Sequence, residues 1–309
     1  MLAVGGLGVK TVVTAEANSQ AVPAAFTRTC WRGIRIGHPA DWEAAFLSGH
    51  GQPHRCVLVD RGFQRLEAHW QVLPRRPDLN QMYERLGKSF KDSRPPALTG
   101  VPEWTGLVRR DKGGWIVHAG RFFQPRRCLV QVILTWPGRR DRALERAVLD
   151  AIAPQPNDDL ILWQALGLAA MVPKEFELVD CSSKVGRVCW EFRRPKRASE
   201  GLTVERLAMP RYWLKSSVSE WLTGELPRGF KVWRESSVDC GRQAGTEIYS
   251  RRSNPLVGLL RKGVSRLDRA WLCREQQRVY RVACWRRARG ETEWPAGLEV
   301  CSDSRVKLT

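Results

Sequence analysis

Apolar and polar residues alternate along most of this chain, and stretches with helical spacing interrupt the alternation. One order of elements occurs twice. The first copy opens with WRGIRIGHPADWEAAF at 31–46 and the second with WQALGLAAMVPKEFEL at 163–178. In each copy a Trp precedes alternating apolar residues, and a Pro is followed three residues later by an aromatic residue. Such alternation is typical of a strand with one buried face, and the pattern predicts an internal duplication.

After this opening each copy has two strand-like runs, a helical stretch and three further strand-like runs. The helical stretches are 79–90 in the first copy and 211–222 in the second, and only the first copy has a clear closing helix, at 141–152. Short connections between the runs favour antiparallel pairing. The predicted fold class is α+β, with two similar domains, each a mainly antiparallel sheet covered by helices.

This duplication predicts the domain organisation of the chain. The predicted segments are a leader or arm at 1–30, a first repeat at 31–153, a linker at 154–162 and a second repeat at 163–309 that carries a helical insertion at 253–269.

The insertion, SNPLVGLLRKGVSRLDR, takes the place of the four residues QPRR that join two runs of the first copy. Its Ser-Asn-Pro opening is typical of a helix start. The helix would pack on its own sheet, bind a partner protein or lie on a membrane surface. Because the first copy does without it, we favour a partner-binding role for Leu256, Leu259, Leu260, Arg261, Lys262, Val264, Arg266 and Leu267.

The opening GIRIGHPADW, the helix after the third strand and the closing helix resemble the PsbP-like superfamily. The resemblance covers about 31–153 and again about 163–305, as tandem domains. It implies a sandwich of sheet and helices that is used mostly to bind proteins rather than for catalysis. No functional residue transfers, because no site motif of the superfamily is present.

Cysteine usage and the N-terminus bear on the compartment. The nine cysteines include no C-x-x-C pair, and several lie within apolar strand-like runs. They are expected to be reduced and mostly buried, which predicts a cytoplasmic protein. Residues 1–21 lack the basic start and the unbroken apolar stretch of a signal peptide.

The chain is strongly basic, with a net charge of +19 that both halves share. Such a charge favours polyanionic partners. The leading hypothesis is a non-enzymatic binding or scaffold protein that docks on a larger, acidic protein assembly. The alternative is a nucleic-acid-binding component that uses the distributed Arg surface; contact with a membrane surface ranks behind both.

No pattern in the sequence predicts catalysis, a metal site or a cofactor. All five histidines lie in the first copy, and His50 and His54 are spaced around Gly51 and Pro53, which disfavour the helix that such a metal pair needs. His54 and Cys56 share a strand face but lack an acidic residue to orient the His. Gly-rich phosphate loops are also missing.

Overall fold

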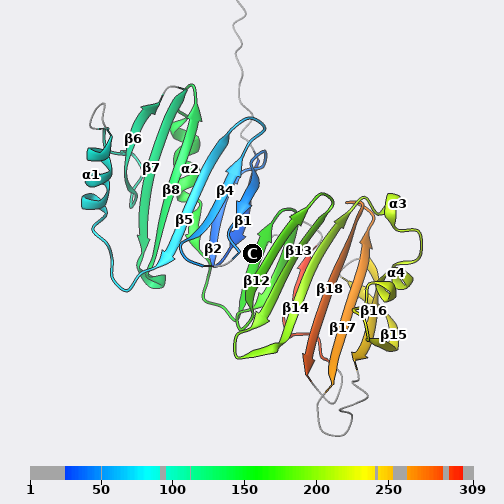
Figure 1. Cartoon of the computed structure of the whole chain (residues 1–309). Helices are drawn as coiled ribbons and strands as arrows, with labels where there is room; N and C mark the ends of the chain where they lie inside the picture. Colours follow the sequence, from blue (N-terminus) through cyan, green and yellow to red (C-terminus); the bar gives the residue numbers. More distant parts are fainter. Residues whose placement is uncertain are drawn as a thin grey trace, which may run out of the picture.

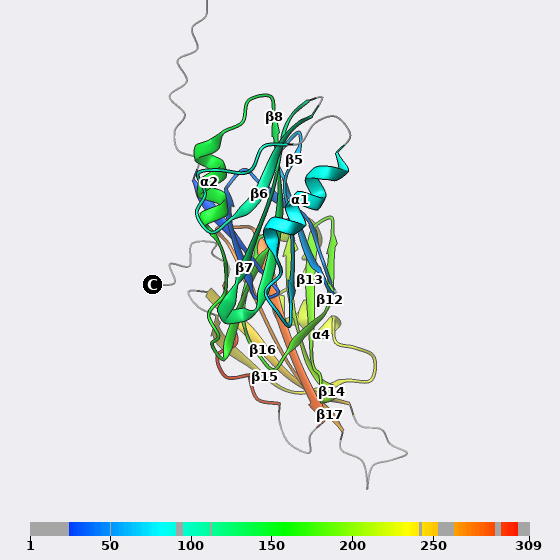
Figure 2. The same ribbon diagram turned by 90° about the vertical axis from the view of Figure 1, so that its left-hand side faces the viewer.

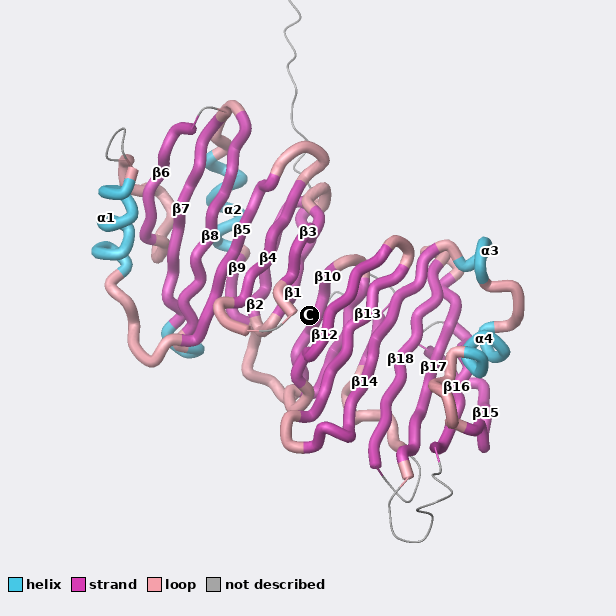
Figure 3. Tube along the Cα trace, viewed as in Figure 1, coloured by secondary structure: helices cyan, strands magenta, loops and turns pink. Residues whose placement is uncertain are grey.

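A computed structural model describes residues 25–49, 51–90, 95–111, 113–240, 243–252, 263–287 and 292–301 (Figure 1). Of these residues, 57% lie in strands and 13% in helices, and the strands form three antiparallel sheets (Figure 3). The predicted α+β class is therefore wrong: the protein is mostly β. The helical stretches were identified but given too much weight, because they are short and contact only a few strands each.

The first-half sheet is built entirely from the first copy of the duplicated unit. Its six strands, in spatial order, are β3 (Glu43–Leu47), β4 (His54–Val59), β5 (Gln64–Val72), β8 (Cys128–Pro137), β7 (Gly114–Phe123) and β6 (Thr105–Asp111). A 3₁₀ turn, η1 (Gln124–Arg126), joins β7 to β8.

The two helices of the first half lie on opposite sides of this sheet (Figure 2). Helix α1 (Leu79–Ser89) contacts β6, and Asp78 caps it by accepting a hydrogen bond from the Gln81 amide. Helix α2 (Arg142–Asp150) packs against the strands of the neighbouring sheet and buries Val148 and Leu149.

The second-half sheet repeats this strand order and adds one strand. Its seven strands, in spatial order, are β12 (Glu177–Lys184), β13 (Arg187–Arg194), β14 (Arg197–Ala208), β18 (Arg278–Arg287), β17 (Val264–Cys273), β16 (Gln243–Arg252) and β15 (Lys231–Cys240). The predicted helix at 211–222 is two short helices, α3 (Pro210–Trp213) and α4 (Val218–Gly224). A capping box between Ser217 and Glu220 starts α4 and separates the two.

The central sheet joins the two halves, because each half contributes three of its strands. In spatial order these are β9 (Ile152–Pro154), β2 (Ile34–Pro39), β1 (Phe26–Trp31), β10 (Leu160–Ala165), β11 (Leu168–Pro173) and β19 (Glu299–Cys301). Residues 26–30 and 160–162 therefore belong to strands rather than to a leader or a linker. The halves share a sheet and are not two separate bodies.

Local geometry supports the duplication. A two-residue turn with positive φ at both positions closes β1–β2 at Arg32–Gly33 and β10–β11 at Leu166–Gly167. After each hairpin the aromatic residue of the Pro-x-x-aromatic pattern donates its amide to the Pro carbonyl, at 3.1 Å from Trp42 to Pro39 and 3.0 Å from Phe176 to Pro173. The stretches read as single strands at 31–36 and 163–168 are thus hairpins.

The core is continuous across the boundary between the halves. Trp31 of β1 meets Trp163 of β10 edge to face, with ring centroids 5.1 Å apart, and also meets Trp190 of β13 at 5.5 Å. Trp31 and Trp190 are fully buried. Such aromatic pairs add to the hydrophobic stabilisation of their burial, so the two halves are expected to unfold together.

The insertion predicted at 253–269 is not a helix as far as the structure describes it. Residues 264–269 lie in β17, and residues 253–262 lie outside the described residues. The strand order also changes the comparison behind that prediction. β16, β17 and β18 take the places of β6, β7 and β8, so the connection from β16 to β17 corresponds to the one from β6 to β7 rather than to QPRR.

Candidate partner-binding surface and junction pocket

The additional strand β15 forms an edge of the second-half sheet. Its first five residues, 231–235, are all exposed, and its outer side pairs with no other described strand. In the first half the corresponding edge is covered by a short segment in which Ala97 bridges Leu107 and Leu98 donates to Gly106 at 2.9 Å. An open strand edge presents unpaired N–H and C=O groups to any chain that approaches it.

A β-bulge in β15 turns Trp233 outward. Val232 pairs with Ser250 and Arg234 with Tyr249, so Trp233 has no partner in the register and its side chain is 55% exposed. Its ring lies 6.1 Å from that of Tyr249, and the Arg234 guanidinium lies 3.8 Å from the Tyr249 centroid. Bulges often re-aim a side chain in this way. Trp, Tyr and Arg are also the residue types enriched among interface hot spots.

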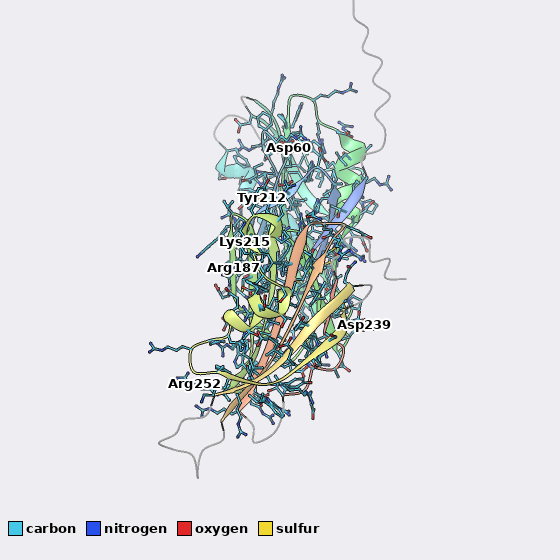
Figure 4. The ribbon with its side chains drawn as sticks, turned by 90° about the vertical axis from the view of Figure 1, so that its right-hand side faces the viewer. Asp60, Arg187, Tyr212, Lys215, Asp239 and Arg252 are labelled. Atoms are coloured by element: carbon cyan, nitrogen blue, oxygen red, sulfur yellow. The ribbon has the colours of Figure 1, made fainter. Side chains whose placement is uncertain are left out.

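A cluster of cations adjoins this aromatic group. Arg228, Lys231, Arg251 and Arg252 are all exposed, and Lys231 pairs with Arg251 across the two strands. Within the described ranges none of the four forms an ion pair with a carboxylate. Figure 4 shows Arg252 and Asp239 at opposite ends of the β15–β16 pair, so the basic residues gather at one end. We call Trp233, Arg234, Tyr249 and these four cations the β15 surface.

A second feature is a pocket of about 480 Å³ where the two halves meet. It lies between the central sheet and the end of the second-half sheet, and its lining includes Arg28, His38, Glu43, Arg206 and Arg278. Arg28 donates to the Gln164 side chain at 3.1 Å. Three arginines therefore line this junction pocket together with one carboxylate.

His38 has a structural place in the pocket wall. Its Nδ1 donates to the Pro39 carbonyl at 2.9 Å, which leaves Nε2 to accept from the Thr29 hydroxyl at 3.0 Å. Burial lowers the pKa of His38, so the ring is neutral near pH 7. Among the described residues no carboxylate hydrogen-bonds to His38 or Thr29, and both side chains are almost fully buried.

A third polar group is the ion network beneath α4. Asp268 is fully buried and accepts from Arg266 at 2.6 Å and from Arg281 at 2.9 Å. Arg281 also faces Glu205 at 3.5 Å, and Glu205 pairs with Arg187. Each charge has a partner of opposite sign, which is the usual condition for burying ions. This network is enclosed and has the character of a structural element rather than a ligand site.

The thiols are unsuited to nucleophilic catalysis. Eight of the nine cysteines are described, all are free, and five of them are buried. Burial raises the pKa of the thiol to about 11 in Cys30, Cys128, Cys181 and Cys240, to about 12 in Cys56 and Cys189, and upward in Cys284. Because the thiolate is the nucleophile, these groups are inert at neutral pH.

Two further findings concern ligands and membranes. In the part of the chain that the structure covers, no group of three His, Cys, Asp or Glu side chains is arranged to hold a metal ion. Among the same residues no helix is long and apolar enough to cross a bilayer.

The residues predicted to bind a partner fall into two groups. Leu256, Leu259, Leu260, Arg261 and Lys262 lie outside the described residues, so their role stays a prediction. Val264, Arg266 and Leu267 belong to β17.

The β17 residues are poorly placed for a partner. Leu267 is fully buried in the sheet, Val264 is half-buried, and the Arg266 side chain is 12% exposed and held by Asp268. Strand pairing places alternate residues of this segment in the core. The spacing of Val264 and Leu267 fits a helical stripe equally well, so it could not separate a helix from a strand.

Sequence reasoning did not identify the β15 surface or the junction pocket. Trp233 lies in a strand, as Trp70, Trp136 and Trp190 do, but those three are buried. Only the bulge sets Trp233 apart, and the sequence carries no clear sign of it. Arg206 and Arg278 lie far apart in the sequence and come together only through pairing of β14 with β18.

No protein-family model and no curated protein matches the sequence. The PsbP-like resemblance therefore stays a prediction. Among solved structures, the chain is similar to the apo immunity protein TplEi of the T6SS from Pseudomonas aeruginosa, at 12% identity over 87% of this chain and 88% of that one, with a TM-score of 0.34. The same protein in complex with "L" peptide is 13% identical over 88% of this chain and 90% of that one, with a TM-score of 0.34.

The Tle4-Tli4 complex gives 13% identity over 88% of this chain and 90% of the matched chain, with a TM-score of 0.35. These values are too low to carry an argument, so the surfaces are interpreted from this chain's own residues.

Proposed function

We propose that this chain is a non-enzymatic protein that binds another protein through the β15 surface. The observation that carries the proposal is the exposed Trp233, held outward by a bulge on an edge strand that the first half does not have. A large aromatic side chain left in water on an open edge is costly unless something covers it. Trp233, Arg234 and Tyr249 together supply the residue types that anchor protein interfaces.

The partner we propose is acidic. The four cations beside Trp233, none of which pairs with a carboxylate among the described residues, favour a partner with carboxylates at the matching positions. The net charge of +19 steers such a partner from a distance. Docking on a larger assembly, as a scaffold, is the wider form of this proposal. Segment 253–262, which contains five of the residues predicted to bind a partner, follows Arg252 directly in the sequence and lies outside the described residues.

Nucleic acid is the less favoured partner. Binding of single strands requires several exposed aromatic rings on which bases stack. Eight of the fourteen tryptophans are buried, five are half-buried, and Trp233 alone is exposed. The exposed rings of Phe26, Phe46 and Phe63 belong to the first half, and the exposed ring of Tyr212 belongs to α3. The single exposed indole on β15 therefore suits one anchor in a protein interface better than a stacking platform.

The test compares the wild type with Trp233→Ala, the double variant Arg251→Glu/Arg252→Glu, and Phe63→Ala as a matched control. Phe63 is 56% exposed in the connection between β4 and β5 of the first half, so its loss removes a similar aromatic area elsewhere. Each immobilised protein is incubated with nuclease-treated lysate of the native cell. We expect one protein to be retained by the wild type and by Phe63→Ala.

Trp233→Ala is expected to retain that protein at least about tenfold less, which corresponds to loss of one hot spot. The double charge reversal should weaken capture most at low salt. Equal retention by all variants would overturn the proposal. Capture that disappears on nuclease treatment would favour the nucleic-acid alternative.

An immunity role, which is how TplEi is described, is one form of partner binding that a growth assay can test. The argument for binding comes from the β15 surface itself. In such an assay the chain would be co-produced with a toxic protein from the same cell. Growth should be restored by the wild type and by Phe63→Ala but not by Trp233→Ala.

A further inference from the structure

The junction pocket contains two cations that face each other without a carboxylate between them. An ideal Cβ on Gly167 would lie 2.6 Å from Nη1 of Arg206 and 2.9 Å from Nη1 of Arg278, so both guanidinium groups converge on one turn of the central sheet. Within the described residues neither forms an ion pair with a carboxylate. Arg278 instead interacts with the Tyr280 hydroxyl, and Nε of Arg206 is buried without a hydrogen-bond partner.

This arrangement is unfavourable in the free protein. Burial and the charge of Arg278 both lower the pKa of Arg206, which means that the surroundings disfavour its charged form. An arginine nevertheless remains protonated in proteins. Two like charges in a partly desolvated site repel each other, and the repulsion is relieved when an anion enters between them.

The first half shows that the fold does not need these cations. Strands β5 and β8 of the first half pair at their ends in the same way as β14 and β18 of the second half. Val72 lies opposite Cys128, and Ala208 lies opposite Arg278. Counted from these ends, Trp70 takes the place of Arg206 and Cys128 that of Arg278. Trp70 is buried and donates a hydrogen bond to the carbonyl of Arg32 in the β1–β2 turn. In the second half Arg206 approaches the equivalent turn, between β10 and β11, at Gly167.

Exposed apolar residues at the pocket's end of the second-half sheet favour a peptide over a free inorganic anion. At the same end of the second-half sheet, Val185, Met209 and Tyr212 are large apolar or aromatic residues that are exposed. Ala208 donates to Gly186 at 2.7 Å, which holds the Val185–Gly186 turn beside Met209. Ser183 and Val188 of the same hairpin line the pocket. An acidic residue flanked by apolar ones would satisfy the cations and cover these exposed side chains together.

From these observations we infer that the junction pocket binds a carboxylate of an acidic peptide segment, held between Arg206 and Arg278. Guanidinium–carboxylate hydrogen bonds are charge-assisted and among the strong ones in proteins. The inference rests on the proposed function because it assumes that the bound partner is a protein. It concerns a surface separate from the β15 surface. A small anion would meet the same guanidinium groups, and the experiment distinguishes the two sources.

The probe is a fluorescein-labelled hexapeptide of alternating Leu and Glu, with the Gln counterpart as its neutral control, at about 150 mM salt to screen long-range attraction. Anisotropy is measured for the wild type, Arg206→Gln, Arg278→Gln and Arg85→Gln. Arg85 is an exposed arginine on α1, outside both the pocket lining and the β15 surface, so its variant removes the same charge. We expect about a tenfold loss of affinity for each pocket variant, the size of one charge-assisted contact, and less than twofold for Arg85→Gln.

Equal losses in all three variants, or equal binding of the Glu and Gln peptides, would overturn the inference. Inorganic phosphate at millimolar concentration is expected to leave the peptide bound. If phosphate instead displaces it from the wild type and binds in a manner that depends on Arg206, the pocket takes a small anion and the peptide assignment is wrong.

Thermal unfolding separates a binding role from a structural one. Removing one of two repelling cations should leave Tm unchanged or raise it, and Arg206→Trp, which copies the first half, should raise it by about 2 °C while abolishing peptide binding. A fall in Tm for both Arg206 variants would assign a structural role and overturn the inference. Trp233→Ala should bind the peptide like the wild type. If the pocket inference fails, the test of the β15 surface is therefore unaffected.

Discussion

The two halves of the chain place different side chains at matching positions on the helix-covered faces of their sheets. Where the first half has two histidines and a glutamine, the second has two carboxylates and a guanidinium. Counted from the paired strand ends, the matching residues are His69 and Glu205, Gln131 and Arg281, and His118 and Asp268. The strand order around them is the same. Backbone pairing and the alternation of buried residues therefore preserve the fold, while the polar positions have diverged.

This divergence has different energetic consequences in the two halves. In the first half Gln131 donates to the sulfur of Met82 and His118 lies against the Phe90 ring, which are weak contacts. The second half buries ions whose partners must all be present, because a buried charge without its partner is costly. We therefore expect the second half to tolerate substitution at these positions less well than the first.

The largest expected effect tests whether the halves share one core. Trp31→Ala should lower the free energy of unfolding by about 3–5 kcal/mol, because it leaves a cavity beside Trp163 and Trp190, both of which contact the Trp31 ring. In urea the wild type should unfold in one transition. The variant should unfold in two transitions, so that fluorescence and circular dichroism give different midpoints. The exposed Trp233→Ala serves as the control and should change stability by less than about 0.5 kcal/mol. A single unshifted transition in Trp31→Ala would contradict the shared core.

The next effect sharpens the difference between the buried faces. Asp268→Ala should lower the free energy of unfolding by about 3 kcal/mol, because Arg281 and Arg266 both lose their fully buried partner. The matched variant His118→Ala, at the same sheet position in the first half, should cost about 1 kcal/mol. Chemical denaturation of both variants gives the comparison. Equal costs would show that the network is not the source of the difference.

The smallest effect depends on pH and should come from the first half alone, which holds all five histidines. Burial lowers the pKa of His38, His54 and His118. The unfolded chain, with a His pKa near about 6.5, then binds more protons than the folded protein, so stability is lost as the pH falls below that value. The loss is on the order of 1 kcal/mol for each unit by which a pKa is depressed.

Urea unfolding at pH 7.5 and 5.5 measures this loss, and His38→Gln should reduce it. The destabilisation by Asp268→Ala should have the same size at both pH values, because no histidine lies in the second half. A variant without His38 that keeps the full pH dependence would place the acid sensitivity elsewhere.

Much of the local structure could be predicted from the sequence, because it depends on nearby residues. Alternating runs such as RCLVQVILTW predicted strands, and the apolar face of 79–90 predicted α1. The fold class was wrong because Ser217 starts a new helix where one continuous helix was expected, and because Val264 and Leu267 fit helical spacing while lying in a strand. Short windows of apolar residues do not separate these alternatives.

The central sheet and the binding surfaces could not be predicted, because they depend on contacts between distant segments. Cys30 of β1 lies opposite Gln164 of β10, a pairing that no local pattern specifies. Arg206 and Arg278 are two of 40 arginines, and nothing in the sequence marks them as neighbours. The additional strand β15 was counted among the repeated strands, which shifted the comparison of the two copies by one element.

The shared sheet also sets the order in which the chain can finish folding during its synthesis. The edge of β1 is covered soon after the first half emerges, because β10 begins at Leu160, close behind β9. The edge of β11 is covered only by β19, at Glu299–Cys301. Until those residues leave the ribosome, β11 presents an unpaired strand edge, the kind of surface that chaperones protect from aggregation.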